Sequence, residues 1–200
     1  MKSLYSLKPW LTRTLKPVLK LSLRWGISPD FYSLLNVVFG VLAGFAITWF
    51  NFWFVLLFVV LRLVFANLDG ALARAKAAMA NTDLPKSGFT KNEIGDRLAD
   101  FGMLSGLIFL SHPNHAATVA LAVVIAATPT LISLIAVRRG LARMNGGPFG
   151  KTERCFAVVV IVGLANLTGQ TETCVYFGAV VILLGSLITA WGRYLKMVRS

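Results

Sequence analysis

The sequence has few acidic residues: eight Asp and Glu stand against twenty Lys and Arg, which gives a net charge of +12. An excess of this size is typical of nucleic-acid-binding proteins, but the sequence contains no nucleic-acid-binding motif. Its basic residues lie instead between apolar segments. An anionic membrane surface and phosphorylated substrates therefore fit the charge better than nucleic acid does.

The sequence also lacks the polar content of a soluble domain, because 56% of its residues are hydrophobic and its mean hydropathy is +0.72. This composition is typical of an integral membrane protein. The first long apolar run begins near Ser33 and is too long for the hydrophobic region of a signal peptide, so we expect no cleavable signal.

Six apolar spans follow one another, and most approach the roughly 20 residues that cross a bilayer as a helix. The fifth is short and is expected to extend back toward Thr152, and Pro129 favours a kink in the fourth. The spans lie at about 33–50, 52–75, 92–110, 116–137, 155–167 and 174–195. The predicted fold class is an all-α, six-helix transmembrane bundle that occupies residues 32–200.

Residues 1–31 form a basic, amphipathic segment in front of this bundle. Basic and apolar side chains fall on different faces of a helix, and two tryptophans, Trp10 and Trp25, suit a membrane interface. The sequence therefore predicts a helix that lies on the membrane surface, in preference to a solvated tail. Its basic face has Lys16, Lys20 and Arg24, and its apolar face has Leu11, Leu15 and Val18.

Lys and Arg are absent from three connections between the spans, near residue 51, at 111–115 and at 166–173. Because positively charged connections stay in the cytoplasm, both termini are predicted to be cytoplasmic, in the inner membrane of a bacterium. Cys155 and Cys174 would then lie about 30 Å apart on opposite faces, too far for a disulfide. His112 and His115 fall in a short outer loop, where a solvated turn is favoured over a metal site.

Half of the eight acidic residues lie between residues 62 and 100, beside strongly apolar sequence: Asp69, Glu93, Asp96 and Asp100. Carboxylates at a membrane edge are costly unless they are compensated. Asp96 and Asp100 share one helical face, and Glu93 falls near it. Ligands that are all oxygens favour a hard divalent ion such as Mg²⁺.

The order of these residues resembles a known signature. Asp69 opens DGALAR, and Asp96 and Asp100 follow after a link, as in the DxxDGxxAR and GxxxDxxxD halves of the CDP-alcohol phosphotransferase family. The resemblance implies a homodimer that binds Mg²⁺, with Mn²⁺ as an alternative. It implies that Asp69, Asp96 and Asp100 bind the metal, that Asp100 is the general base, and that Asp69, Gly70, Ala73 and Arg74 bind the nucleotide.

The activity that the resemblance implies is phosphatidyl transfer in phospholipid biosynthesis. An alcohol acceptor would attack the phosphorus of CDP-diacylglycerol, which gives a phospholipid and CMP. Glycerol phosphate, inositol phosphate and serine all remain candidates for the acceptor. Two other functions stay open: a membrane transporter, and a catalytically reduced relative that binds lipid or nucleotide without turnover.

Two positions depart from the signature: Ala66 stands in the first Asp position, and Asn92 stands in the Gly position of the second half. Glu93 either supplies the missing metal ligand or caps a helix that starts beside it. Asn67 could instead contribute its amide oxygen, or one metal ion could be lost or bound weakly. A further interpretation replaces the metal site with a buried ion-pair network that includes Arg62 and Arg97.

Two shorter segments complete the candidate site. The glycine-rich loop at 145–154 is not a P-loop, but its charge favours phosphate binding as much as it favours a flexible cytoplasmic loop. The segment at 28–33 is similar to the TPNxxT sequence of the same family, and Pro29 is equally consistent with an ordinary helix start. The residues assigned to a substrate phosphate are Arg138, Arg139, Lys151 and Arg154.

Overall fold

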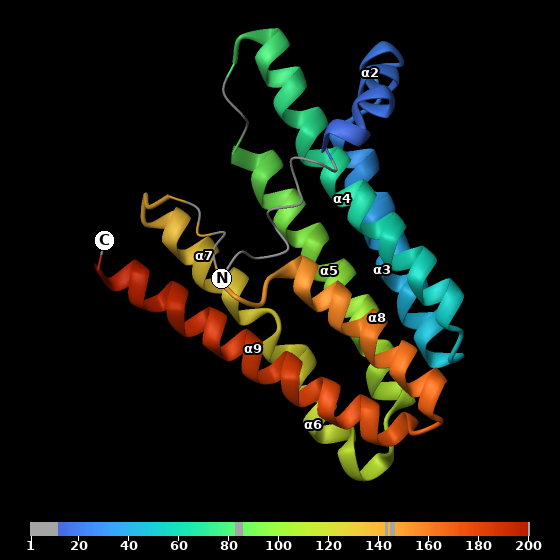
Figure 1. The fold of residues 1–200 in the computed structure, drawn as a ribbon. Coiled ribbons are helices and arrows are strands. Elements are labelled where there is room, and N and C mark those ends of the chain that lie inside the picture. The colour runs from blue at the N-terminus through green and yellow to red at the C-terminus, as the bar shows by residue number, and fades with distance from the viewer. Residues whose placement is uncertain (1–11, 83–85, 143, 145–146, 200) are drawn as a thin grey trace.

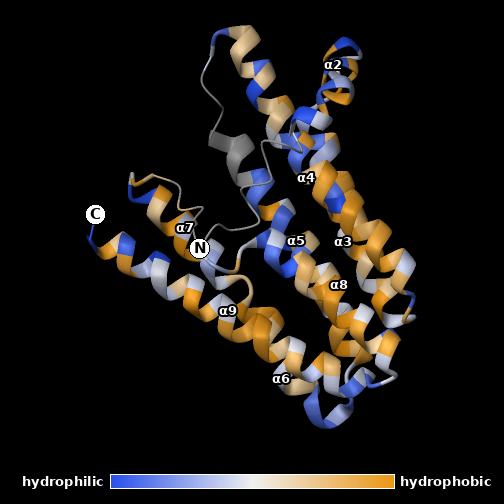
Figure 2. Ribbon diagram, viewed as in Figure 1, coloured by the Kyte–Doolittle hydropathy of each residue, from blue (hydrophilic) through white to orange (hydrophobic). Residues whose placement is uncertain are grey.

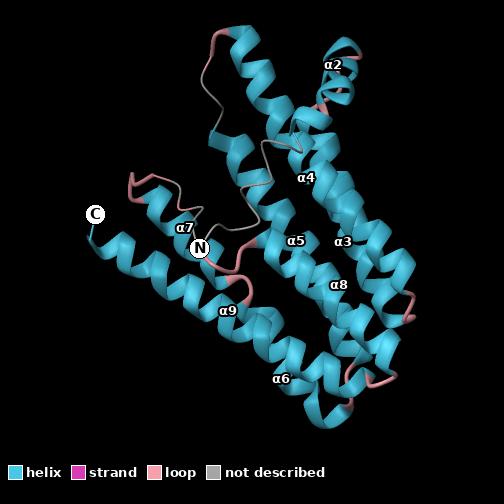
Figure 3. Ribbon diagram, viewed as in Figure 1, coloured by secondary structure: helices cyan, strands magenta, loops and turns pink. Residues whose placement is uncertain are grey.

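The computed structural model describes residues 12–82, 86–142, 144 and 147–199, and within these ranges the chain is built from helices and loops alone (Figure 3). A short helix, α2 (Lys16–Arg24), precedes the bundle, and a 3₁₀ turn, η2 (Pro113–His115), leads into its fourth segment. The bundle consists of α3 (Pro29–Thr48), α4 (Phe52–Ala80), α5 (Lys86–Leu110), α6 (Ala116–Ile125), α7 (Thr128–Arg138), α8 (Lys151–Thr168) and α9 (Thr171–Arg199).

Among the described residues, four helical runs are long and apolar enough to cross a membrane: α3, α4, the run from η2 to α7, and α9. The helices α5 and α8 coincide with the other two predicted spans, but both carry several charged side chains and fall outside this group (Figure 2). The structure therefore supports a multi-pass membrane protein. Six membrane crossings stay a prediction.

Local signals explain where several helices begin and end. The side chain of Ser28 accepts a hydrogen bond from the amide of Phe31, 3.3 Å away, so α3 begins with an N-cap followed by Pro29. Asn51 caps α4 through the amide of Phe54. The predicted interruption at Pro129 is confirmed, because α6 ends at Ile125 and α7 starts at Thr128.

The helices α3 and α5 pack backbone against backbone through glycines. A Cβ atom added at Gly44 would lie 2.1 Å from the carbonyl oxygen of Gly102, and one added at Gly106 would lie 2.3 Å from that of Gly44. Gly40 approaches the backbone of Ala99 in the same way. Small residues four apart allow such close approach, and here they fix the register of α5 against α3.

The surface of the bundle exposes many large apolar side chains, among them Trp49, Trp53 and Leu167, which are 79%, 74% and 85% exposed. Apolar surface on this scale is typical of helices that face lipid. The connections α3–α4, α5–η2 and α8–α9, which lack Lys and Arg, lie at one end of the bundle, away from α2 (Figure 1). This arrangement agrees with the predicted orientation, which stays a prediction.

The helix α2 packs against α3 and α4. Leu19 and Leu23 of α2, together with Leu15 just before it, contact a small core around Leu68 and Leu72. The hydroxyl groups of Ser22 and Tyr32 are 2.6 Å apart. Part of the apolar face of α2 therefore packs against the protein core. The position of α2 at a membrane surface stays a prediction. Residues 1–11 lie outside the described residues.

The glycine contact gives a stability prediction. Gly44→Ala should destabilise the bundle by roughly 1–3 kcal/mol, because the added methyl group must push two backbones apart. Gly192→Ala is the matched control, since a Cβ there meets no atom within 4 Å. Thermal unfolding in detergent measures both variants. Equal melting temperatures for the two would contradict the close packing of α3 and α5.

The orientation is tested by cysteine labelling. In a Cys174→Ser background, a membrane-impermeant maleimide should label Gln170→Cys in intact cells, because Gln170 is exposed in a connection without basic residues. Arg139→Cys, which is exposed at the end of α7, should react only after permeabilisation. The reverse pattern would show that the predicted orientation is wrong.

Candidate functional site

A pocket lies where α4, α5 and α8 meet, beside α7, α9 and the loop before α8. Most of the residues predicted to act together line it, and they come from three helices. They are Asp69, Gly70 and Arg74 of α4, Glu93, Asp96 and Arg97 of α5, and Lys151 and Arg154 of α8. Asp100 lies deeper, one turn beyond Asp96, and Ala73 is not part of the lining.

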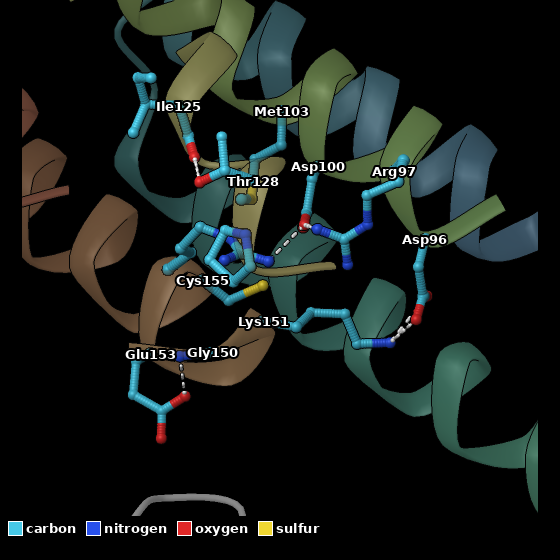
Figure 4. Close-up of polar contacts among 12 residues, drawn as sticks. Asp96, Arg97, Asp100, Met103, Ile125, Thr128, Gly150, Lys151, Glu153 and Cys155 are labelled. Atoms are coloured by element: carbon cyan, nitrogen blue, oxygen red, sulfur yellow. Dashed lines mark hydrogen bonds and ion pairs between the residues drawn. The ribbon is translucent and has the colours of Figure 1, made fainter. Parts of the chain in front are cut away.

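Asp100 is held by three arginines from three helices. Arg62 of α4 donates a hydrogen bond to its Oδ1 atom, and Arg154 Nη2 of α8 donates to its Oδ2 atom at 2.7 Å. Arg97 Nη1 lies 2.6 Å from the same Oδ2 as an ion pair (Figure 4). Both carboxylate oxygens of Asp100 are therefore occupied by guanidinium groups.

Arg62 is fully buried, one turn before Ala66 on the same face of α4. Its Nη1 atom lies 2.9 Å from the sulfur of Cys155 and 3.5 Å from that of Met103. An unpaired charge in such surroundings would be very costly. Arg62 therefore depends on Asp100 as its carboxylate partner.

Asp96 is paired with the lysine that opens α8. Lys151 Nζ lies 2.7 Å from Oδ1 and 2.8 Å from Oδ2 of Asp96 (Figure 4). The amide of Asn36 on α3 also donates to Oδ1 at 2.9 Å. The close α3–α5 packing places Asn36 and Asp96 opposite one another, so this contact follows from the glycine register.

Asp69 differs from the other two aspartates because no ion pair joins it to a cation in the part of the chain that the structure describes. Ser33 of α3 donates to Oδ2 at 2.9 Å, whereas Oδ1 is buried and has no hydrogen-bond partner among the described residues. Ser33 belongs to the 28–33 segment, which is thereby tied to the site. Asp69 Oδ1 is a carboxylate oxygen that remains available to a ligand.

Glu93 does not cap a helix. The helix α5 begins at Lys86 and has no acidic residue in its first turn, so the dipole interpretation of Glu93 is wrong. Its side chain is nearly buried and lies on the pocket wall. The sequence missed this because the polar start of α5 does not look like part of a membrane span.

In the glycine-rich segment, the positive side-chain charge comes from Lys151 and Arg154 of α8, and two amides of the loop before α8 are engaged within the protein. The amide of Phe149 donates to the hydroxyl of Thr189 at 3.0 Å, and that of Gly150 donates to Glu153 Oε2 at 3.0 Å. Residues 145 and 146 lie outside the described residues. Arg138 and Arg139 are exposed and do not line the pocket, so the structure separates them from Lys151 and Arg154.

Known proteins were compared by sequence and by structure. No protein-family model matches the chain, and no curated protein sequence matches it. Several solved structures match it by fold. The fold resembles that of the phosphatidylinositol phosphate synthase of Mycobacterium tuberculosis.

Three structures of that enzyme align with nearly the whole chain. The form with CDP-DAG bound has a TM-score of 0.75 at 21% identity and covers 92% of this chain and 94% of its own. The form with manganese and citrate has a TM-score of 0.74 at 20% identity, and the alignment covers 91% of this chain and 88% of that one. The apo form has a TM-score of 0.73 at 21% identity, and the alignment covers 92% of this chain and 95% of that one. At this identity the likeness establishes the fold.

The residues present do not fit a divalent metal ion as they are arranged. Ala66 offers no ligand, and the oxygens of Asp96 and Asp100 are occupied by Lys151 and by arginines. In the described part of the chain, no three His, Cys, Asp or Glu side chains are grouped so that they could hold a metal ion. The interpretation of this site as a buried ion-pair network with Arg62 and Arg97 describes these contacts better.

Proposed function

We propose that the chain is a phosphatidyltransferase of phospholipid biosynthesis, which transfers a phosphatidyl group from CDP-diacylglycerol to an alcohol acceptor and releases CMP. The observation that carries the proposal is the convergence of both motif halves in one pocket. Asp69, Gly70 and Arg74 face Asp96 there, in a fold whose solved neighbour binds CDP-DAG. The homodimer and the inner-membrane location implied by the sequence belong to the same proposal.

The transfer requires one bond to form and one to break. The acceptor hydroxyl oxygen attacks the phosphorus that carries the diacylglycerol, the bond from this phosphorus to the CMP oxygen breaks, and the hydroxyl proton passes to a base. Charge on the pyrophosphate must be neutralised throughout. Arg74, exposed at the pocket and without an ion-pair partner among the described residues, suits this role.

The contacts of the aspartates bear on which of them could act as the base. Asp100, the predicted base, must first release an arginine before it accepts a proton. Asp69 already has an oxygen without a partner, Oδ1, in the pocket wall. Mg²⁺ or Mn²⁺ would need the same release at Asp96 and Asp100, so we derive no step through a metal ion.

A catalytically reduced relative is the second candidate. Ala66 and the three arginines on Asp100 favour it, because they leave no carboxylate at one motif position and constrain another. Such a protein would bind a CDP-linked lipid without turnover. The assay that separates the two is CMP release by purified protein in nanodiscs, with an acceptor screen read by lipid mass spectrometry.

The proposal predicts the effect of two substitutions. Asp96→Asn and Asp100→Asn should each lower CMP release at least about 100-fold, because each disturbs charges that surround the reacting phosphorus. Glu172→Gln is the matched control: Glu172 is exposed in the first turn of α9, lies 3.2 Å from His115, and does not line the pocket. Near-normal activity in either pocket variant would contradict the assignment of this site.

A further inference from the structure

We propose that lysine and arginine side chains take the place of divalent metal ions in this pocket. The chain would then bind the pyrophosphate of a CDP-linked ligand through Lys151 and neighbouring cations, with no metal ion. The identity of the ligand rests on the proposed function, which this inference deepens by naming the groups that hold the pyrophosphate.

Two positions on one face of α4 disfavour a metal ion. Ala66 lacks the carboxylate that the family signature places there. Arg62, one turn earlier, is a buried guanidinium that donates to Asp100. The site therefore lacks one negative ligand and holds a buried positive charge beside another. Both features disfavour a cation and favour an anion.

The charged side chains at the pocket already carry a positive excess. Asp96 and Asp100 contact four cationic side chains. With the other charged residues of the lining, which are Asp69, Arg74, Glu93, Glu153 and Arg193, six cations stand against five carboxylates at their usual charges. A divalent ion would raise this excess to three positive charges. The four cationic side chains are Arg62, Arg97, Lys151 and Arg154.

A metal ion could bind only if these pairs opened. Asp100 would have to leave Arg62, which is fully buried and contacts the sulfur atoms of Cys155 and Met103 besides. Removal of one partner from a buried pair leaves an uncompensated charge and is strongly unfavourable. The arginines therefore protect Asp100 from a metal ion as well as neutralise it.

Lys151 is placed to contact a ligand directly. Its ammonium group has three N–H donors, and the two short contacts to Asp96 leave a donor that can serve a ligand. Its side chain is 24% exposed and lies on the pocket wall, together with Arg74 and Arg97. Asp96, which also accepts from Asn36, holds Lys151 in position, so the charge of Lys151 is pre-organised for phosphate oxygens.

The decisive experiment measures the binding of CDP, used as a soluble probe, to the full chain in nanodiscs by calorimetry. In excess EDTA the dissociation constant should stay within about twofold of its value in Mg²⁺. Lys151→Met, which keeps most of the apolar stem of the side chain and removes its charge, should weaken binding about tenfold or more. Lys91→Met is the control, because Lys91 is exposed outside the pocket and pairs with Asp30.

Loss of CDP binding in EDTA, with recovery on addition of Mg²⁺ or Mn²⁺, would overturn the inference. The inference would also be overturned if Lys151→Met bound CDP in EDTA as tightly as the wild-type protein does. If Lys151→Met fails to fold because Asp96 is left buried and unpaired, the double variant Lys151→Met with Asp96→Asn removes both charges. That variant should fold and bind CDP weakly, and wild-type affinity in it would equally contradict the role of Lys151.

The proposed function fails in a different way. Metal-independent CDP binding without transfer to any acceptor would refute the transferase and leave the metal-free site intact. Transfer that stops in EDTA and resumes with Mg²⁺ would support the transferase and refute the metal-free site. Absence of CDP binding with and without metal would refute both.

Discussion

The contact of Asp100 with three arginines is the interaction on which the site depends. Arg62, Arg97 and Arg154 come from α4, α5 and α8, so one carboxylate ties three helices together at the same depth. Arg62 is fully buried, and Asp100 is its carboxylate partner among the described residues. Because a buried charge without a partner is strongly destabilising, loss of Asp100 alone would destabilise the fold by leaving Arg62 uncompensated.

Helix packing turns this charge cluster into a pocket. Glycines of α3 and α5 bring the two backbones into contact, which sets Asn36 against Asp96 and Ser33 against Asp69. The helix α8 then delivers Lys151 to the other side of Asp96. Two carboxylates that resemble metal ligands in sequence are thereby directed at side-chain cations. The same residues would bind a phosphate group through the cations that they position.

Much of the architecture could be predicted from apolar run lengths, from Pro129 and from the capping residues, because these are local signals. The convergence of Asp69 and Asp96 followed from the spacing of the motif. Their partners did not follow, since the residue that faces Asp96 depends on helix register, which hydropathy does not determine. The Gly40–Gly44 and Gly102–Gly106 pairs were visible signals of that register. Arg154 was assigned to a substrate phosphate, whereas it binds Asp100.

The most direct test of this account is an experimental structure of the protein with CDP and Mn²⁺, in which anomalous scattering locates any manganese ion. The account predicts Lys151 Nζ within hydrogen-bonding distance of a phosphate oxygen, Arg62 still on Asp100, and no anomalous peak among Asp69, Asp96 and Asp100. A manganese peak at coordination distance from Asp96 and Asp100, with Lys151 and the arginines turned away, would contradict it.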